Sequence, residues 1–585
     1  MIRWFLFPAV VLWLWAIASL SVAQTNSPQN AAVAFYQQGL AALQHGDPAA
    51  ARSAFEKVVK LEPKSGEAHN LLGFALLSSS EYEGAVAEFR TALKLKPDFP
   101  AAHINLATAL SAKGDLAAAE TSARDAVRLA PKDAEAHRML GRVLSRRGDL
   151  SGAIAELRRA TELEPQRADL HDELGSVLVQ NHHTDEAVAE FTEALRLDPR
   201  WPAAQLHLGA IRWQQKQLTE ARQLLEGAVA TAPQSAAAHY YLGVVLADAG
   251  DPQGAIRELA AATKLPPPIP DAFTKLGLLQ QRNGDANDAV ETFKKSVQLD
   301  PNNPDTHNNL GMALIQVGEA TNAIPEFEAA LKLRPDDSGY RLNLGVARLQ
   351  KADFDGAIAE FQKALELTPN DATTHYNLGL ALKLKDQLPA AIEEFRKAAA
   401  LDPSQADAQY TLGVTLWQQG NFDQAVDALQ AAIHARPDYA EAYYTLGTVL
   451  KQQRKLPEAA AALREAIKLQ PEFAGAHTTL AAVLRQLGDS DGAAAEAKLG
   501  AEIAKAKTGL QAATFATNSG RRLLNAGDLD GAISQFRSAV VQSADYAPAH
   551  FYLAQALDRK GDSDEAKREY QRAGQLDPNF QSPTK

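Results

Sequence analysis

The sequence predicts an all-α fold, an α-solenoid of about sixteen 34-residue repeats that each form a helix, a turn and a second helix. Three observations predict it. Thirteen prolines recur every 34 residues from Pro63 to Pro471. When repeat 1 is counted from residue 32, position 20 is alanine in all sixteen repeats. Position 8 is glycine in thirteen repeats and alanine in three. Such a period is typical of stacked supersecondary units.

The N-terminal residues do not follow the repeat. Arg3 precedes an apolar run of 17 residues from Trp4 to Leu20, and the small residues Ser21 and Ala23 follow. This pattern predicts a secretory signal peptide at residues 1–23 and a short linker at 24–31. We therefore expect an exported protein, periplasmic or secreted. The alternative is a protein anchored in a membrane by this segment left uncleaved, although the apolar run is short for a bilayer span.

The first helix of each repeat, helix A, carries leucine at position 7 in fourteen repeats, next to the small residue at position 8. The small residue lets the two helices of a repeat approach closely, and a larger side chain there would overpack the contact. Position 4 is histidine in nine repeats. We interpret these histidines as packing residues, because one histidine per repeat does not form a converging metal or catalytic site.

A turn and the second helix, helix B, follow. Position 15 is often glycine and position 16 often aspartate, as in Gly46-Asp47 and Gly114-Asp115. This pair is typical of a helix C-terminus followed by the N-cap of the next helix. Helix B has Ala at position 20, Phe or Leu at position 24 and Ala at position 27. These positions are at helical spacing, so they predict the face of helix B that packs in the core.

The repeat is interrupted once. Fourteen repeats occupy residues 32–507, five residues at 508–512 are inserted, two repeats occupy 513–580, and a tail follows at 581–585. The repeat before the insertion has Lys505 in place of its proline. We expect an over-long helix B from Ala493 to Lys507 and a partly separate end module formed by the last two repeats.

These residues resemble the tetratricopeptide repeat (TPR) family. Leu-Gly at positions 7–8, Ala at 20, Phe at 24 and Pro at 32 all match its pattern, whereas position 4 is usually histidine instead of the family's tryptophan. The Asn-Leu-Gly repeats and their number are similar to the long superhelix of the O-linked N-acetylglucosamine transferases, whose catalytic domain we do not expect here. The resemblance implies a right-handed superhelix in which helices A line a concave groove.

The composition excludes several kinds of chemistry. The absence of cysteine excludes disulfides, thiol catalysis, cysteine-ligated zinc and iron–sulfur clusters. A formal net charge of −12 argues against nucleic acid as the main partner. The sequence contains no nucleophile elbow, phosphate-binding loop, dinucleotide fingerprint or zinc-protease motif. We expect no enzyme activity, no cofactor and no metal.

The resemblance places positions 2, 5, 6, 9, 12 and 13 of helix A in or near the groove. Position 6 of six successive repeats forms a polar ladder that can hydrogen-bond the backbone of an extended peptide: Asn309, Asn343, Asn377, Thr411, Thr445 and Thr479. Aromatic residues that can anchor a partner are Tyr376, Tyr410 and Tyr444 at position 5, and Trp213 and Trp417 at position 12. The alternatives are that the ladder only fills a polar position and that the aromatic residues pack laterally between neighbouring helices A.

Three arginines form a further candidate. Arg138, Arg142 and Arg146 are spaced four residues apart on one helix A and can clamp an acidic segment. The alternative, which we favour, is ion pairing between repeats, because Asp169 and Glu173 stand at adjoining positions of the next repeat.

The expected function is that of an exported, non-enzymatic scaffold. It would hold other proteins or extended peptides in the groove, mainly in the C-terminal half where the ladder runs. Two alternatives remain open: an assembly factor for envelope machinery such as polysaccharide export or pilus assembly, and a targeting subunit of a separately encoded glycosyltransferase. The sequence leaves the oligomeric state open.

Overall fold

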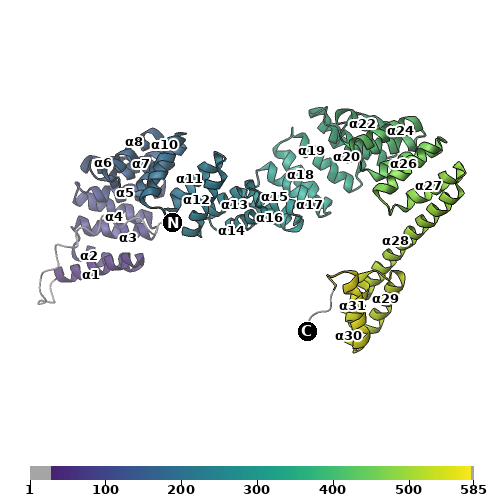
Figure 1. The fold of residues 1–585 in the computed structure, drawn as a ribbon. Helices are drawn as coiled ribbons and strands as arrows, with labels where there is room; N and C mark the ends of the chain where they lie inside the picture. The colour runs from purple at the N-terminus through teal and green to yellow at the C-terminus, as the bar shows by residue number, and fades with distance from the viewer. Residues whose placement is uncertain (1–27, 581–585) are drawn as a thin grey trace. The chain divides into compact units, whose positions relative to one another are not determined.

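The computed structural model describes residues 28–580, and this part of the chain contains 31 helices and no strand (Figure 1). The predicted signal peptide and the tail at 581–585 lie outside the described residues. Helix α1 begins at Pro28, inside the segment 24–31 assigned to a linker. In the described range, no helix is both long and apolar enough to cross a bilayer.

The helices follow the repeat closely. Helix B begins at position 17 in all sixteen repeats, and helix A begins at position 1 in every repeat except repeats 1 and 15. Helices A are α1 (Pro28–Gln44), α3 (Gly66–Ser78), α5 (Pro100–Lys113), α7 (Ala134–Arg147), α9 (Ala168–Gln180), α11 (Pro202–Gln214), α13 (Ala236–Asp248), α15 (Pro270–Asn283), α17 (Pro304–Gln316), α19 (Ser338–Gln350), α21 (Ala372–Leu384), α23 (Ala406–Gln418), α25 (Ala440–Gln452), α27 (Ala474–Leu487) and α30 (Ala547–Lys560).

Each helix B packs against the helix A before it, and the predicted α-solenoid is confirmed. Helices B are α2 (Pro48–Leu61), α4 (Tyr82–Leu95), α6 (Leu116–Leu129), α8 (Leu150–Leu163), α10 (Thr184–Leu197), α12 (Leu218–Thr231), α14 (Pro252–Ala262), α16 (Ala286–Leu299), α18 (Ala320–Leu333), α20 (Phe354–Leu367), α22 (Leu388–Leu401), α24 (Phe422–Ala435), α26 (Leu456–Leu469), α29 (Leu529–Gln542) and α31 (Ser563–Leu576). Helix α28 (Ser490–Asn525) serves repeats 14 and 15 together.

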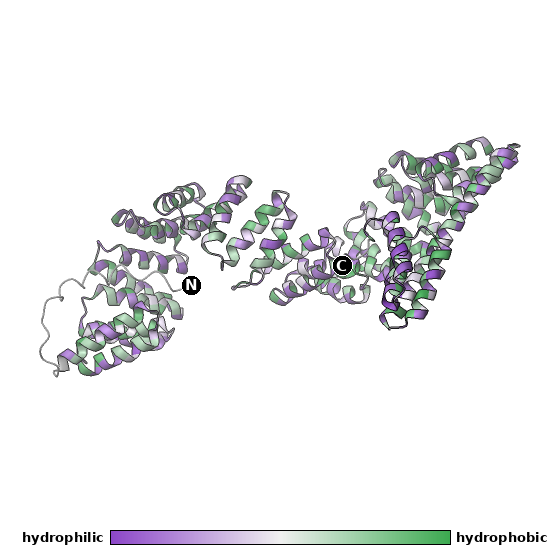
Figure 2. Ribbon diagram, turned by 60° about the horizontal axis from the view of Figure 1, so that its bottom comes forward, coloured by the Kyte–Doolittle hydropathy of each residue, from purple (hydrophilic) through white to green (hydrophobic). Residues whose placement is uncertain are grey.

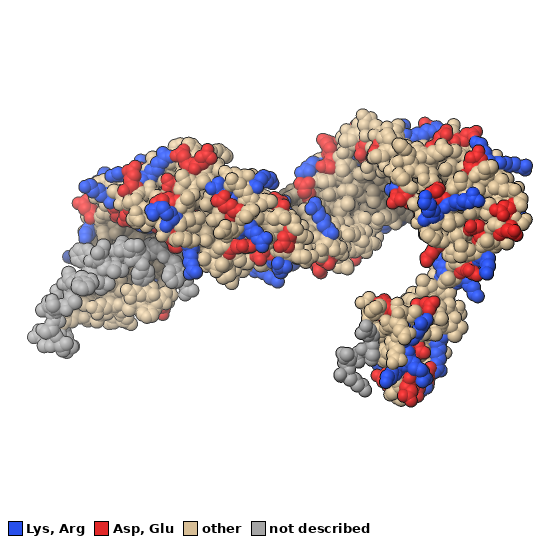
Figure 3. Space-filling view, viewed as in Figure 1, with Lys and Arg blue, Asp and Glu red and all other residues tan. Residues whose placement is uncertain are grey.

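The chain divides into two compact units. The N-terminal unit ends at Leu299 and contains α1 to α16; the C-terminal unit begins at Asp300 and contains α17 to α31. In both units hydrophobic and hydrophilic residues are mixed along the helices (Figure 2). Acidic and basic side chains are interspersed on the visible surface (Figure 3).

The core of each repeat is built on the contact between position 8 and position 24. A Cβ atom added to Gly345 would lie 2.4 Å from a ring carbon of Phe361, and one added to Gly39 would lie 2.5 Å from Phe55. The glycine therefore allows the aromatic ring to rest on the backbone of helix A. Alanine at position 20 is at most 2% exposed in all sixteen repeats.

The histidines at position 4 hold neighbouring repeats together. In eight repeats the ring Nδ1 lies 2.5–2.7 Å from a glutamate Oε2 at position 23 of the same repeat. The Nε2 lies 2.9–3.2 Å from a backbone carbonyl oxygen that ends the preceding repeat, at proline in seven cases and at Ala544 in the last. We call this arrangement the histidine clip. It agrees with the interpretation of position 4 as a packing position.

The turns between helices A and B tolerate more residue types than glycine. Gly114 has φ of 87°, in the left-handed region that suits glycine. Six other repeats place a non-glycine residue at position 15 in the same region, with φ between 59° and 63°: Ser80, His182, Lys216, Ala352, Asp386 and Arg454. The turn geometry is therefore kept where the glycine is lost.

Helix α28 changes the stacking inside the C-terminal unit. It runs for 36 residues and includes the inserted residues 508–512, so that helix B of repeat 14 and helix A of repeat 15 are one helix. One hydrophobic core of the unit ends at Ala493, and the next cores along the chain include Ala513 and Leu524. None of residues 501–512, which lie between them, is buried.

Candidate partner-binding groove

Helices A lie on the inner side of each stack. Within the C-terminal unit, α23 contacts α25 and α25 contacts α27, and in the N-terminal unit α5 contacts α7. Among the described residues, successive helices B do not contact one another to a comparable extent. Elements on the inner side of a curved stack approach most closely. We call the surface formed by successive helices A the A face.

Side chains on the A face bond laterally from one repeat to the next along two lines. Along the first, position 5 meets position 6 of the next repeat: Asn105 Nδ2 donates to Asn70 Oδ1 at 3.0 Å. Along the second, position 12 meets position 13 of the next repeat: Trp213 Nε1 donates to Asp248 Oδ2 at 2.8 Å. We call the second line the 12–13 seam.

In the N-terminal unit, the arginine cluster forms an ion network. Arg138 is 1% exposed, and its Nε donates to Glu173 Oε2 at 3.0 Å while its Nη1 lies 3.1 Å from Asp169 Oδ2. Arg142 Nε donates to the same Glu173 oxygen at 2.9 Å. Burial opposes the charge of Glu173, but its hydrogen bonds with the two arginines hold its pKa below the ordinary value. Arg138 is therefore an internal residue of the repeat joint, which is the ion-pairing alternative, and it does not face the groove.

The other two arginines lie at the surface. Arg142 and Arg146 are exposed and help to line a hollow of about 500 Å³ formed by residues of α5, α7, α8 and α9. Arg146 Nη1 donates to the backbone oxygen of Ser111 at 2.6 Å. Both exposed arginines are thus already bonded to neighbouring repeats.

The polar ladder at position 6 lies in the C-terminal unit, and several of its groups have partners within the chain. Asn343 Nδ2 donates to Asn308 Oδ1 at 2.8 Å. Asn377 Nδ2 donates to its own helix, at Thr373 O, also at 2.8 Å. The hydroxyl of Thr445, a residue 5% exposed, donates to Glu441 O. The remaining ladder residues are half-buried: Asn309, Thr411 and Thr479.

The aromatic candidates are half-buried and pack against neighbouring side chains. The ring centroids of Tyr410 and Tyr439 are 5.0 Å apart, and those of Tyr444 and Phe473 are 4.7 Å apart. The Tyr376 ring lies 5.8 Å from the ring of its core partner Phe395. These contacts fix the rings while leaving part of each ring accessible.

Trp417 repeats the geometry of Trp213 in the 12–13 seam. Its Nε1 donates to Gln452 Oε1 of the next repeat at 2.8 Å. Both indoles are half-buried and bonded across the joint between repeats. A partner on the A face would meet indole rings that are already oriented.

The structure draws attention to three basic residues that sequence reasoning missed. Position 12 of repeats 11 to 14 reads Lys383, Trp417, Lys451 and Arg485. Lys383 and Lys451 are half-buried and Arg485 is exposed. Within residues 28–580 none of these three basic side chains forms a salt bridge. A comparison of position 12 between successive repeats of the sequence identifies these three residues.

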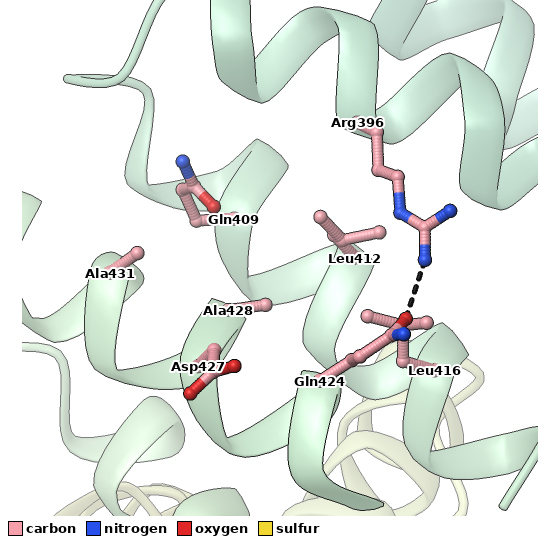
Figure 4. Close-up of a pocket in the computed structure, with 8 residues that line it drawn as sticks. All are labelled: Arg396, Gln409, Leu412, Leu416, Gln424, Asp427, Ala428 and Ala431. Carbon is pink, nitrogen blue, oxygen red and sulfur yellow. Dashed lines mark hydrogen bonds between the residues drawn. The ribbon is translucent and has the colours of Figure 1, made fainter. Parts of the chain in front are cut away.

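A second hollow, of about 450 Å³, lies where a histidine clip is missing (Figure 4). Repeat 12 has Gln409 and Ala428 at positions 4 and 23, where eight repeats have histidine and glutamate. Arg396 points toward Gln424 beside this hollow and donates a hydrogen bond to its Oε1 (Figure 4). The hollow is bordered by helices B α22 and α24 and by helix A α23, whose lining residues Gln409, Leu412 and Leu416 are at positions 4, 7 and 11, and it is a packing gap between helices. Within the described residues, no group of three or more His, Cys, Asp or Glu is placed to hold a metal ion.

Sequence-family models match most stretches of the chain. One model described as "Tetratricopeptide repeat" matches residues 36–100, 410–471 and 444–506. A second model with the same description matches residues 76–143, 112–174 and 523–582. One described as "TPR repeat" matches residues 379–420. One described as "Cilia and flagella-associated protein 70 C-terminal domain" matches residues 168–378. No curated protein sequence matches the chain.

Several solved structures are similar over parts of the chain. The crystal structure of MamA is 32% identical, covers 28% of this chain and 96% of its own, and has a TM-score of 0.28. The structure of YrrB, titled "a TPR protein with an unusual peptide-binding site", is 24% identical, covers 32% of this chain and 96% of its own, and has a TM-score of 0.29. Yeast Tom70 is 19% identical, covers 79% of this chain and 97% of its own, and has a TM-score of 0.33.

Proposed function

The chain belongs to the tetratricopeptide-repeat family, and from this premise we propose that it is an exported, non-enzymatic scaffold that binds partner proteins or extended peptides on the A face of its C-terminal unit. The observation that carries the proposal is the run of half-buried aromatic residues in successive repeats: Tyr376, Tyr410, Trp417 and Tyr444. Aromatic side chains held in place by neighbours lose little conformational freedom on binding and are frequent anchors in interfaces.

A comparison of the two units supports the C-terminal unit as the one that binds a partner. In the N-terminal unit the charged side chains of Arg138 and Glu173 are paired with each other across the joint between two repeats. In repeats 11 to 14 the A face instead presents partly exposed aromatic and basic groups. The basic groups Lys383, Lys451 and Arg485 form no salt bridge within the described residues, and the aromatic rings are held by neighbours while part of each ring stays accessible to a partner.

Two further parts of the proposal have separate support. Export is supported by the signal-peptide pattern of residues 1–23. A non-enzymatic role is supported by the repetition of like residues along the A face, since catalysis calls for different groups that converge on one reacting atom.

A second candidate function, an assembly factor that acts through its end repeats, is favoured by a different observation. Phe515 and Val541 in repeat 15 are 72% and 83% exposed. Exposed large apolar side chains of this kind can mark an interaction surface.

The two candidates can be separated by affinity capture from the native envelope fraction. We expect Tyr376→Ala/Tyr410→Ala/Trp417→Ala to lose the partner that the wild-type chain retains, because the anchors are removed. The matched variant Phe515→Ala/Val541→Ala should retain it. Loss only in the second variant would favour the assembly factor, and retention by both variants would contradict both candidates.

A further inference from the structure

The basic row of repeats 11 to 14, defined as Lys383, Lys451 and Arg485, differs from several basic side chains on helices B nearby, which form salt bridges. On helices B of the same region, lysines pair with a glutamate three residues earlier, as Lys397 Nζ does with Glu394 at 2.7 Å and Lys468 Nζ with Glu465 at 3.0 Å. The basic row has no such neighbour within the described residues. Its positive charges are therefore available to an external anion.

Lys383 is the member for which a missing counter-ion matters most. It is half-buried, and burial alone lowers the pKa of its ammonium group, with no carboxylate acting to raise it. A partly desolvated ammonium group without a counter-ion is costly. A carboxylate placed against it would regain favourable charge interaction in a region of reduced polarity.

The neighbours of Lys383 and Lys451 across the 12–13 seam are neutral. Position 13 of the next repeat is Gln418 after Lys383 and Gln486 after Lys451, and Gln452 is bonded to Trp417. In the N-terminal unit the same seam contains Asp248, which is bonded to Trp213. An anion approaching the basic row is therefore not repelled by a carboxylate at the seam.

Asp386 and Asp489 follow Lys383 and Arg485 in the turns by three and four residues without forming a salt bridge with them in the described chain, and the other acidic groups of helices A stand at the beginning of the helix. Asp407, at position 2, pairs with Arg436 Nη2 at 2.8 Å. Glu441 is ten residues before Lys451 on the same helix, which corresponds to about 15 Å along the axis. Neither carboxylate neutralises the basic row.

The spacing of the row fits an extended chain. Packed helices lie about 10 Å apart, and an extended peptide advances about 3.3 Å per residue, so each repeat corresponds to about three peptide residues. The tyrosines at position 5 are seven residues, about 10 Å, from position 12 on the same helices. A segment that crosses repeats 11 to 14 would meet a basic group and an aromatic ring at regular intervals.

We propose that the A face of repeats 11 to 14 recognises an acidic extended segment of a partner protein, whose carboxylates bind Lys383, Lys451 and Arg485. This inference rests on the proposed function and names the chemistry of its partner. The expected ligand carries acidic residues separated by about six and then about three positions, in the order of the basic row.

The test uses the full chain and a fluorescein-labelled 12-residue peptide with glutamate at every third position, with binding followed by fluorescence anisotropy. We expect the glutamate peptide to bind more weakly as salt increases, and the same peptide with lysine at those positions not to bind. Lys383→Glu/Lys451→Glu/Arg485→Glu should weaken binding by more than tenfold. The charge-conserving variant Lys383→Arg/Lys451→Arg/Arg485→Lys should remain within about threefold of wild type.

The matched control changes the same total charge on helices B. Lys363→Glu/Lys397→Glu/Lys468→Glu alters three exposed lysines of the C-terminal unit that lie away from the A face. It should change affinity by less than about twofold. Equal weakening in both triple variants would overturn the proposal, because net charge alone would then explain the binding. Circular dichroism of both variants checks that they are folded.

Two further outcomes would also overturn it. If the aromatic variant of the A face loses the native partner while the charge-reversed variant keeps it, the proposed function stands and the acidic ligand is wrong. If a 12-nucleotide single-stranded DNA binds more tightly than the glutamate peptide and loses affinity in the same variant, the basic row recognises nucleic acid and not an acidic peptide.

Discussion

On the A face of the N-terminal unit, charged side chains bond to one another, whereas on that of the C-terminal unit three basic side chains have no carboxylate partner. Arg138 is buried with Glu173 and Asp169, while Lys383 is half-buried with no counter-ion in the described residues. The cores below these surfaces are alike, with glycine at position 8 against a large residue at position 24. The comparison shows that positions outside the core can join repeats, as Arg138 does, or carry a charge without a salt bridge in the described residues, as Lys383 does.

The largest expected effect comes from breaking the buried network. Arg138→Ala removes a buried cation that contacts both Glu173 and Asp169 and leaves Arg142 as the only arginine bonded to Glu173, and we expect it to destabilise the N-terminal unit by about 3–5 kcal/mol. Lys383→Ala should cost less than about 0.5 kcal/mol, because it removes no partner. Local unfolding free energies from hydrogen exchange measure both. Similar losses in the two variants would remove the distinction between the units.

A proline in the middle of α28 tests the interruption that is found only in the C-terminal unit. Lys505→Pro should cost about 3 kcal/mol in helix stability, but the cores on either side should stay folded because residues 501–512 are not buried. Limited proteolysis should show a new cleavage within 501–512. The same change at Lys397, in the packed helix α22, should unfold its repeat, and unfolding of the flanking repeats by Lys505→Pro would contradict the expectation.

The core contact should behave alike in the two units. A Cβ atom would lie 2.7 Å from the Phe191 ring at Gly175 and 2.6 Å from the Phe395 ring at Gly379. We expect Gly175→Ala and Gly379→Ala each to destabilise its unit by about 1–3 kcal/mol through overpacking. Denaturant unfolding compares them. A clear difference between the two variants would show that the units do not share one core.

The smallest expected effect concerns the histidine clip. The hydrogen bond with Glu190 raises the pKa of His171 above its ordinary value near 6.5, with burial opposing it. This contribution to stability is fully present below about pH 6.5 and is lost as pH rises through the raised pKa. His171→Gln should therefore cost about 1 kcal/mol at pH 5.5 and less at pH 8.5.

Repeat 6 naturally contains at position 4 the glutamine that His171→Gln introduces in repeat 5. Gln205 stands at position 4 and its Nε2 donates to Pro199 O at 3.0 Å, so glutamine preserves the bond to the preceding repeat. Unfolding free energies of wild type and variant at both pH values measure the effect. A difference that does not change with pH would assign the effect of the substitution to packing and not to the charge on the ring.

The sequence predicted the fold well because the fold depends on short-range patterns. Ala at position 20 and Gly at position 8 identify the packed faces of two helices within one repeat. The side-chain partners were harder to predict because they lie in the next repeat. The charges of the next repeat indicated the pairing of Arg138 with Glu173, but no pattern indicated the hydrogen bond from Trp417 to Gln452, 35 residues further along. Whether a basic residue is paired, unlike Lys383, depends on those neighbours, so position 12 of the sequence can locate the basic row but cannot show that it forms no salt bridge.

The histidine clip and the contact between positions 8 and 24 together allow the chain to change length in evolution. The core contact is complete within each repeat, and the clip reaches one fixed carbonyl of the preceding repeat. A gene duplication or deletion of 34 codons would therefore join surfaces that already fit. The A face would gain or lose one set of contacts each time, so a new partner could be accommodated by adding repeats without redesigning the core.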